Sequence, residues 1–375
     1  FMADEFGACH IRIPVKSLPA FDKLPSESQI IIDEKFSLIE NTVDEWKKKN
    51  ASKYDLATLI EQRKVFRLKT YYIPFYPKSR FRRGKGEDEG QNLMASFQHK
   101  RPEKGQEAPT WEHWSLQFLK VYENNAPIML TYYIASLFHD IIFKANNSYF
   151  PLLYLFGKPQ SGKSTAARSL LYMFGKPPLE DGVSLGSGST STGLYRYANS
   201  FKNGMVWFNE YKNTIKPFLL EFLKSSADSG SRITGMKTTG NETQQYRASN
   251  GVVFSGQELP TQDPALMSRS IPLEFDGSGR NYSEWKKLID MQHQGLLTSI
   301  TIRLLELRDL MGIYKEASRR EFEEVSSDLR KQYGNVEDRT ILNVSTLLTV
   351  ARIFEAKSGL LLPFSIEKLR EIGRA

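Results

Sequence analysis

A glycine-rich loop between two regular segments constrains the fold of this chain more than any other feature. The segment Tyr154–Leu170 reads YLFGKPQSGKSTAARSL, with an apolar run before the loop and helix-forming residues after it. Gly157–Ser164 matches the pattern G-x-x-x-x-G-K-[ST] in full. The glycines of such a loop let backbone N–H groups surround a phosphate, and the following helix adds the positive end of its dipole. We therefore expect a strand–loop–helix unit that binds a nucleoside triphosphate.

The residues of this loop have separate expected roles. Lys163 can reach the β- and γ-phosphates of ATP, and the hydroxyl of Ser164 can ligate Mg²⁺. ATP and Mg²⁺ are thus the expected cofactors, and the alternative is a glycine loop that matches by chance. The expected nucleotide-binding residues are Gly157, Pro159, Gln160, Ser161, Gly162, Lys163, Ser164 and Thr165.

Short apolar runs alternate with helical segments from residue 149 onward. FPLLYLF, MVWFN, GVVFSG and SIPLEF are the strand candidates, and doubly apolar strands separated by helices are typical of a parallel sheet covered on both faces. The flanking segments have helical periodicity, including SESQIIIDEKFSLIENTVDEWKK and YDLATLIEQRKVFRL. The expected fold class is α/β, a parallel sheet between helices with helical N-terminal and C-terminal regions. The expected regions are 1–108 with a basic linker, 109–277 for the core with its preceding helices, and 278–375 for a C-terminal helical domain.

The segment GMVWFNEYKN supplies an acidic partner for the phosphate loop. Met205–Phe208 is an apolar run, and Asn209 and Glu210 follow at its end. We expect Glu210 to polarise the attacking water and, with Ser164, to hold Mg²⁺ directly or through water. Two carboxylates are the usual pair, so Asn209 in the first place weakens the metal contact. A surface turn is the alternative interpretation.

Two further segments add candidate catalytic residues. GVVFSGQELP ends a strand with polar residues, of which Gln257 is expected to contact the γ-phosphate or the attacking water, with Ser255 as second choice. In DPALMSRSIPLEFD a short helix delivers Arg269, which is well placed to reach the nucleotide of a neighbouring subunit. The expected catalytic set is Lys163, Glu210, Gln257 and Arg269. The alternatives are a plain strand-to-loop turn and an ordinary surface arginine.

The order of these motifs resembles that of ring-forming AAA+ ATPases over residues 149–276. The resemblance is greatest to the helicase domains of virus and plasmid replication proteins, helicase superfamily 3, and to the primase–helicases of phages and mobile elements. GVVFSGQE looks like the third motif of that family, with Gln257 where Asn is usual, and ALMSRSIPLEF is similar to the segment that carries the arginine in these ATPases and in minichromosome-maintenance helicases. The resemblance implies a hexameric ring, ATP hydrolysis at subunit interfaces, translocation on nucleic acid through a pore, and a primase or nuclease region or partner before Phe1.

Candidate nucleic-acid contacts lie between the acidic segment and the third motif. SADSGSRITGMKTTGNETQQYRASN alternates like a hairpin, and in the resembled family a hairpin at this place lines the pore. Arg232, Lys237 and Arg247 are then expected to hold phosphates without reading sequence. The formal net charge of +8 favours an acidic partner, and single-stranded DNA is the first expectation. A solvated surface hairpin is the alternative.

Three other features have ordinary explanations beside functional ones. KSRFRRGKGEDEG interleaves Phe81 with arginines, which suits single strands, but it also reads as a solvated linker. His139 and Asp140 lie on an apolar helix with no second acidic partner, which favours a core or helix-face pair over a metal-dependent phosphohydrolase site. Arg339, at the start of a helix, is either a second sensor arginine that closes over ATP or a helix-end salt bridge.

The residues leave three functions open. The first is an ATP-driven helicase or translocase in the replication of a phage, plasmid or mobile element. The second is an ATPase switch or scaffold in a defence or partition system, without strand separation, which the slow hydrolysis expected from Asn209 would suit. The third is a small-molecule kinase, and the lack of an arginine-rich lid counts against it. The chain has a single cysteine, Cys9, and its N-terminal segment lacks the apolar core of a secretory signal peptide. Both observations fit a cytoplasmic protein without a membrane partner.

Overall fold

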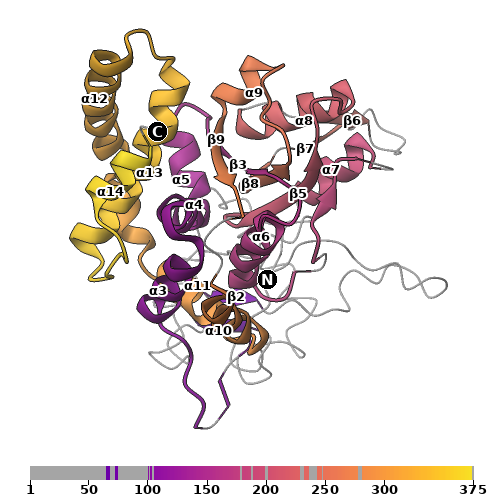
Figure 1. The fold of residues 1–375 in the computed structure, drawn as a ribbon. Coiled ribbons are helices and arrows are strands. Elements are labelled where there is room, and N and C mark those ends of the chain that lie inside the picture. Colours follow the sequence, from indigo (N-terminus) through magenta and orange to yellow (C-terminus); the bar gives the residue numbers. More distant parts are fainter. Residues whose placement is uncertain are drawn as a thin grey trace, which may run out of the picture.

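The computed structural model of the chain is drawn in Figure 1. It describes residues 65–67, 72–74, 100, 102–103 and 105–373, with gaps at 178–179, 187–188, 199–201, 229–231, 236–242, 247 and 278–280.

A parallel sheet of five strands forms the centre of the described part, in the order β4-β5-β8-β3-β9. The strands are β3 (Leu152–Gly157), β4 (Val183–Ser184), β5 (Met205–Tyr211), β8 (Gly251–Gly256) and β9 (Ser270–Phe275). All four strands predicted from apolar runs are confirmed, and so is the α/β fold class. The additional strand β4 has two residues, which is too short for a periodic signal in the sequence.

Alternate residues of β3, β5 and β8 enter two different hydrophobic cores, because successive side chains of a strand point to opposite faces. Leu153 and Leu155 belong to the core formed with α3 (Trp111–Tyr122), α4 (Ala126–Leu137), α5 (His139–Ala145) and α6 (Lys163–Leu171). Leu152 and Tyr154 belong to the core formed with α7 (Ser191–Ala198), α8 (Pro217–Ala227) and α9 (Pro264–Ser268). The predicted arrangement, a sheet between helices, is therefore present.

The C-terminal helices join the first of these cores. They are α10 (Tyr282–His293), α11 (Thr298–Leu305), α12 (Tyr314–Tyr333), α13 (Asp338–Lys357) and α14 (Ile366–Ile372). Figure 1 shows α12, α13 and α14 beside α4 and α5, on the side of the sheet away from α7 and α8. Because one core spans this interface, α3 and α4 link the C-terminal helices to the sheet. The three regions predicted from the sequence stay predictions.

The helix predicted over residues 54–68 is contradicted at its C-terminal end. Residues 65–67 of the segment 54–68 form β1 (Val65–Arg67), which pairs antiparallel with β2 (Tyr72–Pro74). Val65 and Phe66 are residue types that favour strands, and pairing with β2 outweighs the helical pattern. The helix predicted over 26–48 and most of the predicted arm over 76–109 lie outside the described residues.

Among the described residues, no single helix is long and apolar enough to cross a membrane, whereas the bent pair Trp111–Leu137 and His139–Ala145 passes that test by length and composition. Every residue of α4 is buried within the fold. Its apolar character is explained by its position between the sheet and the C-terminal helices.

Helix α4 packs tightly against the sheet at Gly251. A Cβ atom at this position would lie 2.1 Å from Oγ of Ser136 and 3.2 Å from the ring of Tyr132. Neither side chain can move away easily, because Ser136 donates a hydrogen bond to the Tyr132 carbonyl at 2.7 Å and the Tyr132 hydroxyl donates to the Val252 carbonyl at 3.0 Å. Glycine is therefore required here for packing.

Gly251→Ala is expected to lower the free energy of unfolding by about 1–3 kcal/mol, because the extra methyl group overpacks the contact between α4 and β8. The matched control is Gly312→Ala, where an added Cβ atom meets nothing within 4 Å. The control should change the free energy of unfolding by less than about 0.5 kcal/mol. Denaturant unfolding measures both, and equal stability of the two variants would contradict the packing described here.

Candidate functional site

The carboxyl ends of three neighbouring strands meet at one edge of the sheet. The register sets Gly256 of β8 beside Phe156 of β3 on one side and Tyr211 of β5 on the other. The glycine-rich loop follows β3, Gln257 follows β8, and Glu210 lies near the end of β5. Ligands of open α/β sheets bind outside the carboxyl ends of the strands. The fold thus brings three of the predicted catalytic segments to the edge where such a ligand binds.

The loop between β3 and α6 has the shape that its glycines permit. Gly157 has φ 138° and lies so close to β9 that a Cβ atom would be 2.1 Å from the Phe275 carbonyl oxygen. Gly162 has φ 102° and caps the start of α6. Both positions exclude a larger residue, so the two glycines of the pattern are explained by backbone geometry.

Lys163 lies folded into the loop rather than extended into solvent. Its Nζ donates hydrogen bonds to the carbonyl oxygens of Gly157 at 2.7 Å and Lys158 at 2.6 Å, and to Oγ of Ser161 at 3.1 Å. An ammonium group has three donors. An incoming phosphate oxygen therefore has to replace one of these acceptors. Ser164 and Thr165, at the start of α6, are half-buried.

Glu210 occupies an irregularity of β5. The register with β8 shifts between Phe208 and Tyr211, and Glu210 has φ 65°. Its Oε2 accepts a hydrogen bond from Oγ of Ser184, which also accepts one from the Gly186 amide at 2.9 Å. Bulges of this kind turn a side chain away from the regular alternation and occur next to active sites. Sequence reasoning missed Ser184, because β4 carries no recognisable pattern.

Asn209 is held inside the sheet. Its Oδ1 accepts hydrogen bonds from Oγ of Ser255 and from the Glu210 amide, both at 2.8 Å. Ser255 in turn accepts a hydrogen bond from Nε1 of Trp207 at 2.8 Å, and both residues are fully buried. Ser255, the second choice for a phosphate contact, is thus engaged within the sheet. Gln257 lies exposed beyond the end of β8.

Arg269 lies at the opposite end of the sheet from the loop. In the register of β3 with β9, Ser270 pairs with Leu152, and Phe275 pairs with Gly157. Five residue steps of about 3.3 Å separate the two ends by about 17 Å, beyond the reach of one arginine side chain. Arg269 therefore does not contact a nucleotide held by the loop of its own subunit.

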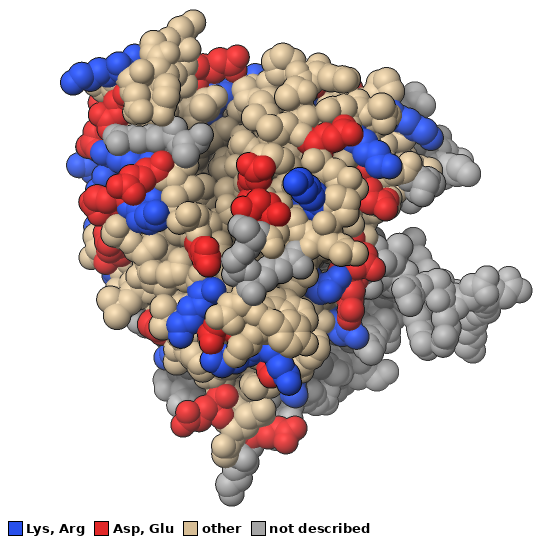
Figure 2. All heavy atoms as spheres, viewed as in Figure 1, with Lys and Arg blue, Asp and Glu red and all other residues tan. Residues whose placement is uncertain are grey.

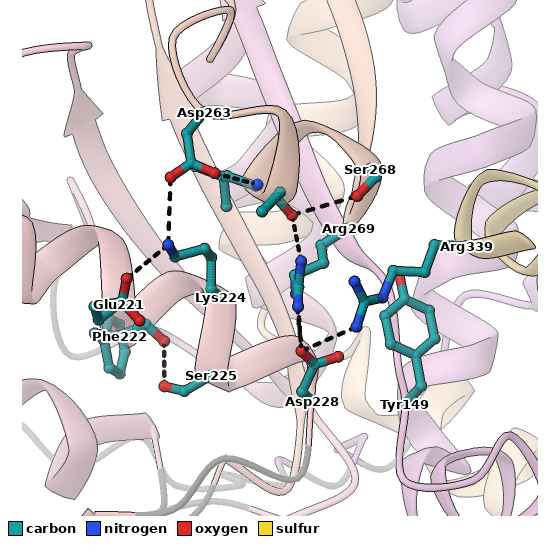
Figure 3. Close-up of polar contacts among 12 residues, drawn as sticks. Tyr149, Glu221, Phe222, Lys224, Ser225, Asp228, Asp263, Ser268, Arg269 and Arg339 are labelled. Carbon is teal, nitrogen blue, oxygen red and sulfur yellow. Dashed lines mark hydrogen bonds and ion pairs between the residues drawn. The ribbon is translucent and has the colours of Figure 1, made fainter. Parts of the chain in front are cut away.

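Figure 3 shows Arg269 beside Asp228 and Arg339. Nε and Nη2 of Arg269 donate to Oδ2 of Asp228 at 2.8 and 2.7 Å, and Nη2 of Arg339 lies 3.6 Å from the same oxygen. The helix-end salt bridge that was one reading of Arg339 is therefore present. The other reading, a second sensor arginine that closes over ATP, stays a prediction, and this corner lies at the amino end of the sheet, away from the loop of the same chain.

The predicted hairpin is present as β6 (Arg232–Gly235) and β7 (Thr243–Tyr246), which pair antiparallel. Arg232 is the first residue of β6 and lies opposite Tyr246. Lys237 and Arg247 lie outside the described residues. On the face drawn in Figure 2, basic and acidic side chains are interspersed, so the net positive charge does not gather into one patch there.

His139 and Asp140 fit the reading that the sequence favoured, a core or helix-face pair, since His139 is buried and Asp140 lies on the exposed face of α5. The His139 ring is buried, with its centroid 5.3 Å from that of Phe143 and 4.6 Å from that of Phe150, while Asp140 forms an ion pair with Arg308. Within the described ranges, no group of three or more His, Cys, Asp or Glu residues is arranged to hold a metal ion.

A cavity of about 690 Å³ opens beside the loop, a size that suits a small-molecule ligand. Ser161 and Thr165 line one side of it, and Tyr282 and Trp285 of α10 line another. The rings of Tyr282 and Trp285 lie 5.3 Å apart, and Tyr282 is 72% exposed. Burial raises the pKa of the Tyr122 hydroxyl in the wall, which therefore stays protonated. Sequence reasoning missed this cavity, although YSEWKK places two aromatic residues three apart in a polar segment.

No family model and no curated protein matches the sequence. Among solved structures, the active helicase Cch of SCCmec type IV is 17% identical with a TM-score of 0.49, covering 70% of this chain and 50% of that one. A candidate ATPase from Cytophaga hutchinsonii is 14% identical with a TM-score of 0.37, covering 70% and 87%. JCV helicase is 17% identical with a TM-score of 0.30, covering 65% and 66%. The chain spans half the length of the first structure, and likeness at this level concerns the fold and does not extend to activity.

Ser255→Ala is expected to lower the free energy of unfolding by about 1–3 kcal/mol, because it leaves the buried Trp207 N–H without its acceptor. Gln257→Ala is the matched control on the same strand end, and it should leave stability within about 0.5 kcal/mol because Gln257 is exposed. Thermal and denaturant unfolding measure both variants. If both are as stable as the wild type, the buried network does not support the sheet.

Proposed function

We propose that this chain is an ATP-hydrolysing, ring-forming helicase or translocase that acts on nucleic acid, in the replication of a phage, plasmid or mobile element. The observation that carries the proposal is the separation of the loop and Glu210 from Arg269 by the length of the sheet. A site whose arginine lies that far from its own phosphate loop can be completed by a neighbouring copy. This supports hydrolysis between subunits of a homo-oligomer, with a hexamer as the expected form.

In this proposal the loop binds the phosphates of ATP, and Lys163 exchanges a loop carbonyl for a phosphate oxygen. Glu210, aimed by the bulge and by Ser184, orients the attacking water, while Gln257 contacts the γ-phosphate. Ser164 and Glu210 are the ligands proposed for Mg²⁺, with Asn209 acting through water. The bound ion would neutralise charge that develops on the phosphates. Arg269 of the neighbouring copy would stabilise the same charge.

The cavity beside the loop is the proposed site of the nucleoside. It adjoins the phosphate loop at Ser161 and Thr165, and its volume of about 690 Å³ leaves room for a purine and its ribose. Trp285 and Tyr282 offer aromatic faces, on which a base can stack. The substrate class proposed is therefore a purine nucleoside triphosphate, with ATP first.

The proposed nucleic-acid contacts are Arg232, Lys237 and Arg247 of the hairpin segment, holding backbone phosphates of single-stranded DNA. A primase or nuclease, as a further region of the protein or as a separate partner, would act on the same nucleic acid during replication. The proposed location is the cytoplasm.

The second candidate function is an ATPase switch or scaffold without strand separation. The amide at Asn209 favours it, since its oxygen is bound by Ser255 and the position lacks the second carboxylate of a fast hydrolase.

ATP turnover with and without single-stranded DNA tests the proposal. The wild type should be stimulated several-fold by DNA, Lys163→Ala should lose turnover, and Arg269→Ala should lose about 10³-fold in kcat. An equal mixture of the two variants should recover part of the activity, because a mixed ring contains interfaces with one intact loop and one intact arginine. Turnover without stimulation, and no retention of DNA at low salt, would contradict a translocase and favour the switch.

Trp285→Ala tests the nucleoside site separately from the phosphate site. It should weaken ATP binding about ten- to a hundredfold, since stacking of one base on an aromatic ring contributes about 1–3 kcal/mol. Binding of inorganic tripolyphosphate, which has no base, should stay unchanged. Titration calorimetry measures both ligands, and Tyr333→Ala removes an exposed aromatic side chain elsewhere as the control. Equal loss for both ligands would show that Trp285 only supports the loop.

A further inference from the structure

One carboxylate joins three elements at the amino end of the sheet (Figure 3). Asp228 follows the last residue of α8, Arg269 follows α9, and Arg339 lies in the first turn of α13. The Asp228 side chain is 28% exposed and that of Arg269 is 12% exposed, whereas 45% of the Arg339 side chain is exposed. We call Asp228, Arg269 and Arg339 the arginine corner. Arg269 is thus largely buried in this corner, whereas Arg339 is accessible to solvent.

The guanidinium of Arg269 is held on one side and has donors left on the other. Two of its N–H groups bind Asp228, and Nη1 donates to the Ala265 carbonyl at 2.6 Å. A guanidinium has five N–H donors in a planar fork. These three bonds leave one N–H donor on Nη1 and one on Nη2, and guanidinium N–H groups bind the oxygens of a phosphate.

Helix α13 fixes the backbone around this arginine. Nδ2 of Asn343 donates to the carbonyl oxygen of Ser268 at 3.0 Å and lies 3.4 Å from that of Ser270, the residues on either side of Arg269. Arg339 and Asn343 are four residues apart and therefore share one face of α13. The helix that brings the second arginine also locks the turn that carries the first.

Tyr149 completes the corner from the segment before β3. Its hydroxyl donates to Oδ1 of Asn343 at 2.6 Å. Burial, and after it the negative charge of Asp228, raises the pKa of Tyr149, so its hydroxyl stays a donor. The amide of Asn343 is thereby oriented with Nδ2 toward the turn.

The three charged groups of the corner carry one positive charge in excess. The neighbouring Lys224 does not add to it, because it pairs with Glu221 at 2.6 Å and Asp263 at 3.3 Å. Without Asp228, the two guanidinium groups would repel each other, and Arg269 would lose the two hydrogen bonds that orient its guanidinium group. The arrangement therefore suits an external anion that approaches both arginines.

We propose that Asp228 is the positioning residue of a two-arginine corner, in which Arg269 and Arg339 together contact the terminal phosphate of a nucleotide held by a neighbouring copy of this chain. This inference rests on the proposed function, because it needs a nucleotide at the partner's loop. The inference adds Arg339 to the residues that contact the neighbour's nucleotide. It also gives Asp228 the role of orienting the two arginines without touching the nucleotide itself.

Asp228→Asn keeps the shape of the side chain and removes its charge. The kcat of the variant should fall about ten- to a hundredfold, the cost of a misplaced catalytic group, while its affinity for ATP stays unchanged because its own loop is intact. Arg339→Gln should lower kcat about tenfold or more, again without loss of ATP affinity. Asp263→Asn is the matched control: it loses the ion pair to Lys224, keeps a side chain that can cap α9, and should stay within twofold of the wild type.

Mixed oligomers separate a positioning role from a structural one. Asp228→Asn protein mixed with Lys163→Ala protein should recover activity, because the intact loop of the first variant meets the intact corner of the second. Asp228→Asn mixed with Arg269→Ala should not recover, because both defects lie in the same corner. Arg339→Gln, at a half-exposed position, gives the same comparison if Asp228→Asn does not fold.

Two results would overturn the inference, and a third would overturn its premise. Wild-type kcat in Asp228→Asn or in Arg339→Gln contradicts the two-arginine corner. Failure of Lys163→Ala to rescue these variants, while it does rescue Arg269→Ala, contradicts their action through the partner's nucleotide. If Arg269→Ala is not rescued either, the shared site of the proposed function is wrong, and the corner has no phosphate to contact.

Discussion

The parallel pairing of β3 with β8 and β9 determines where the phosphate loop, Gln257 and Arg269 can lie. At the carboxyl ends it sets the glycine loop beside β8 and β9, and at the amino ends it sets Arg269 beside the start of β3. The two ends are separated by about 17 Å, since each residue of a strand advances about 3.3 Å. One subunit therefore cannot bring its own arginine to its own loop. The need for a second copy in the proposed site follows from strand direction and length, independently of any surface feature.

The sequence predicted the parts of the fold that depend on local pattern. The strand–loop–helix unit and four of the five central strands were predictable, because apolar runs and the glycines at 157 and 162 impose their conformation locally. The strand with Ser184 was not, since two residues have no period and form a strand only by pairing with β5. The local pattern of Val65–Arg67 predicted a helix, but the segment forms a strand because it pairs with β2, and this pairing cannot be seen in the local pattern. The cavity at Trp285 was missed because it forms between segments far apart in the chain.

Asn209 shows how a departure from the expected motif changes meaning once its neighbours are known. Read alone, it weakens a metal site, because an amide replaces a carboxylate. In the fold, its oxygen joins the buried Ser255 to the Glu210 amide, at the point where β5 leaves its register. The residue therefore helps to hold the irregularity that aims Glu210.

The C-terminal helices contribute to both ends of the sheet. Trp285 of α10 lines the cavity at the loop, while Arg339 and Asn343 of α13 contact the corner around Arg269. One hydrophobic core contains buried residues of both helices, together with α4 and one face of the sheet. Under the proposed function, helices of one C-terminal region would thus help to form both the nucleoside site of their own subunit and the arginine corner that contacts the neighbouring subunit.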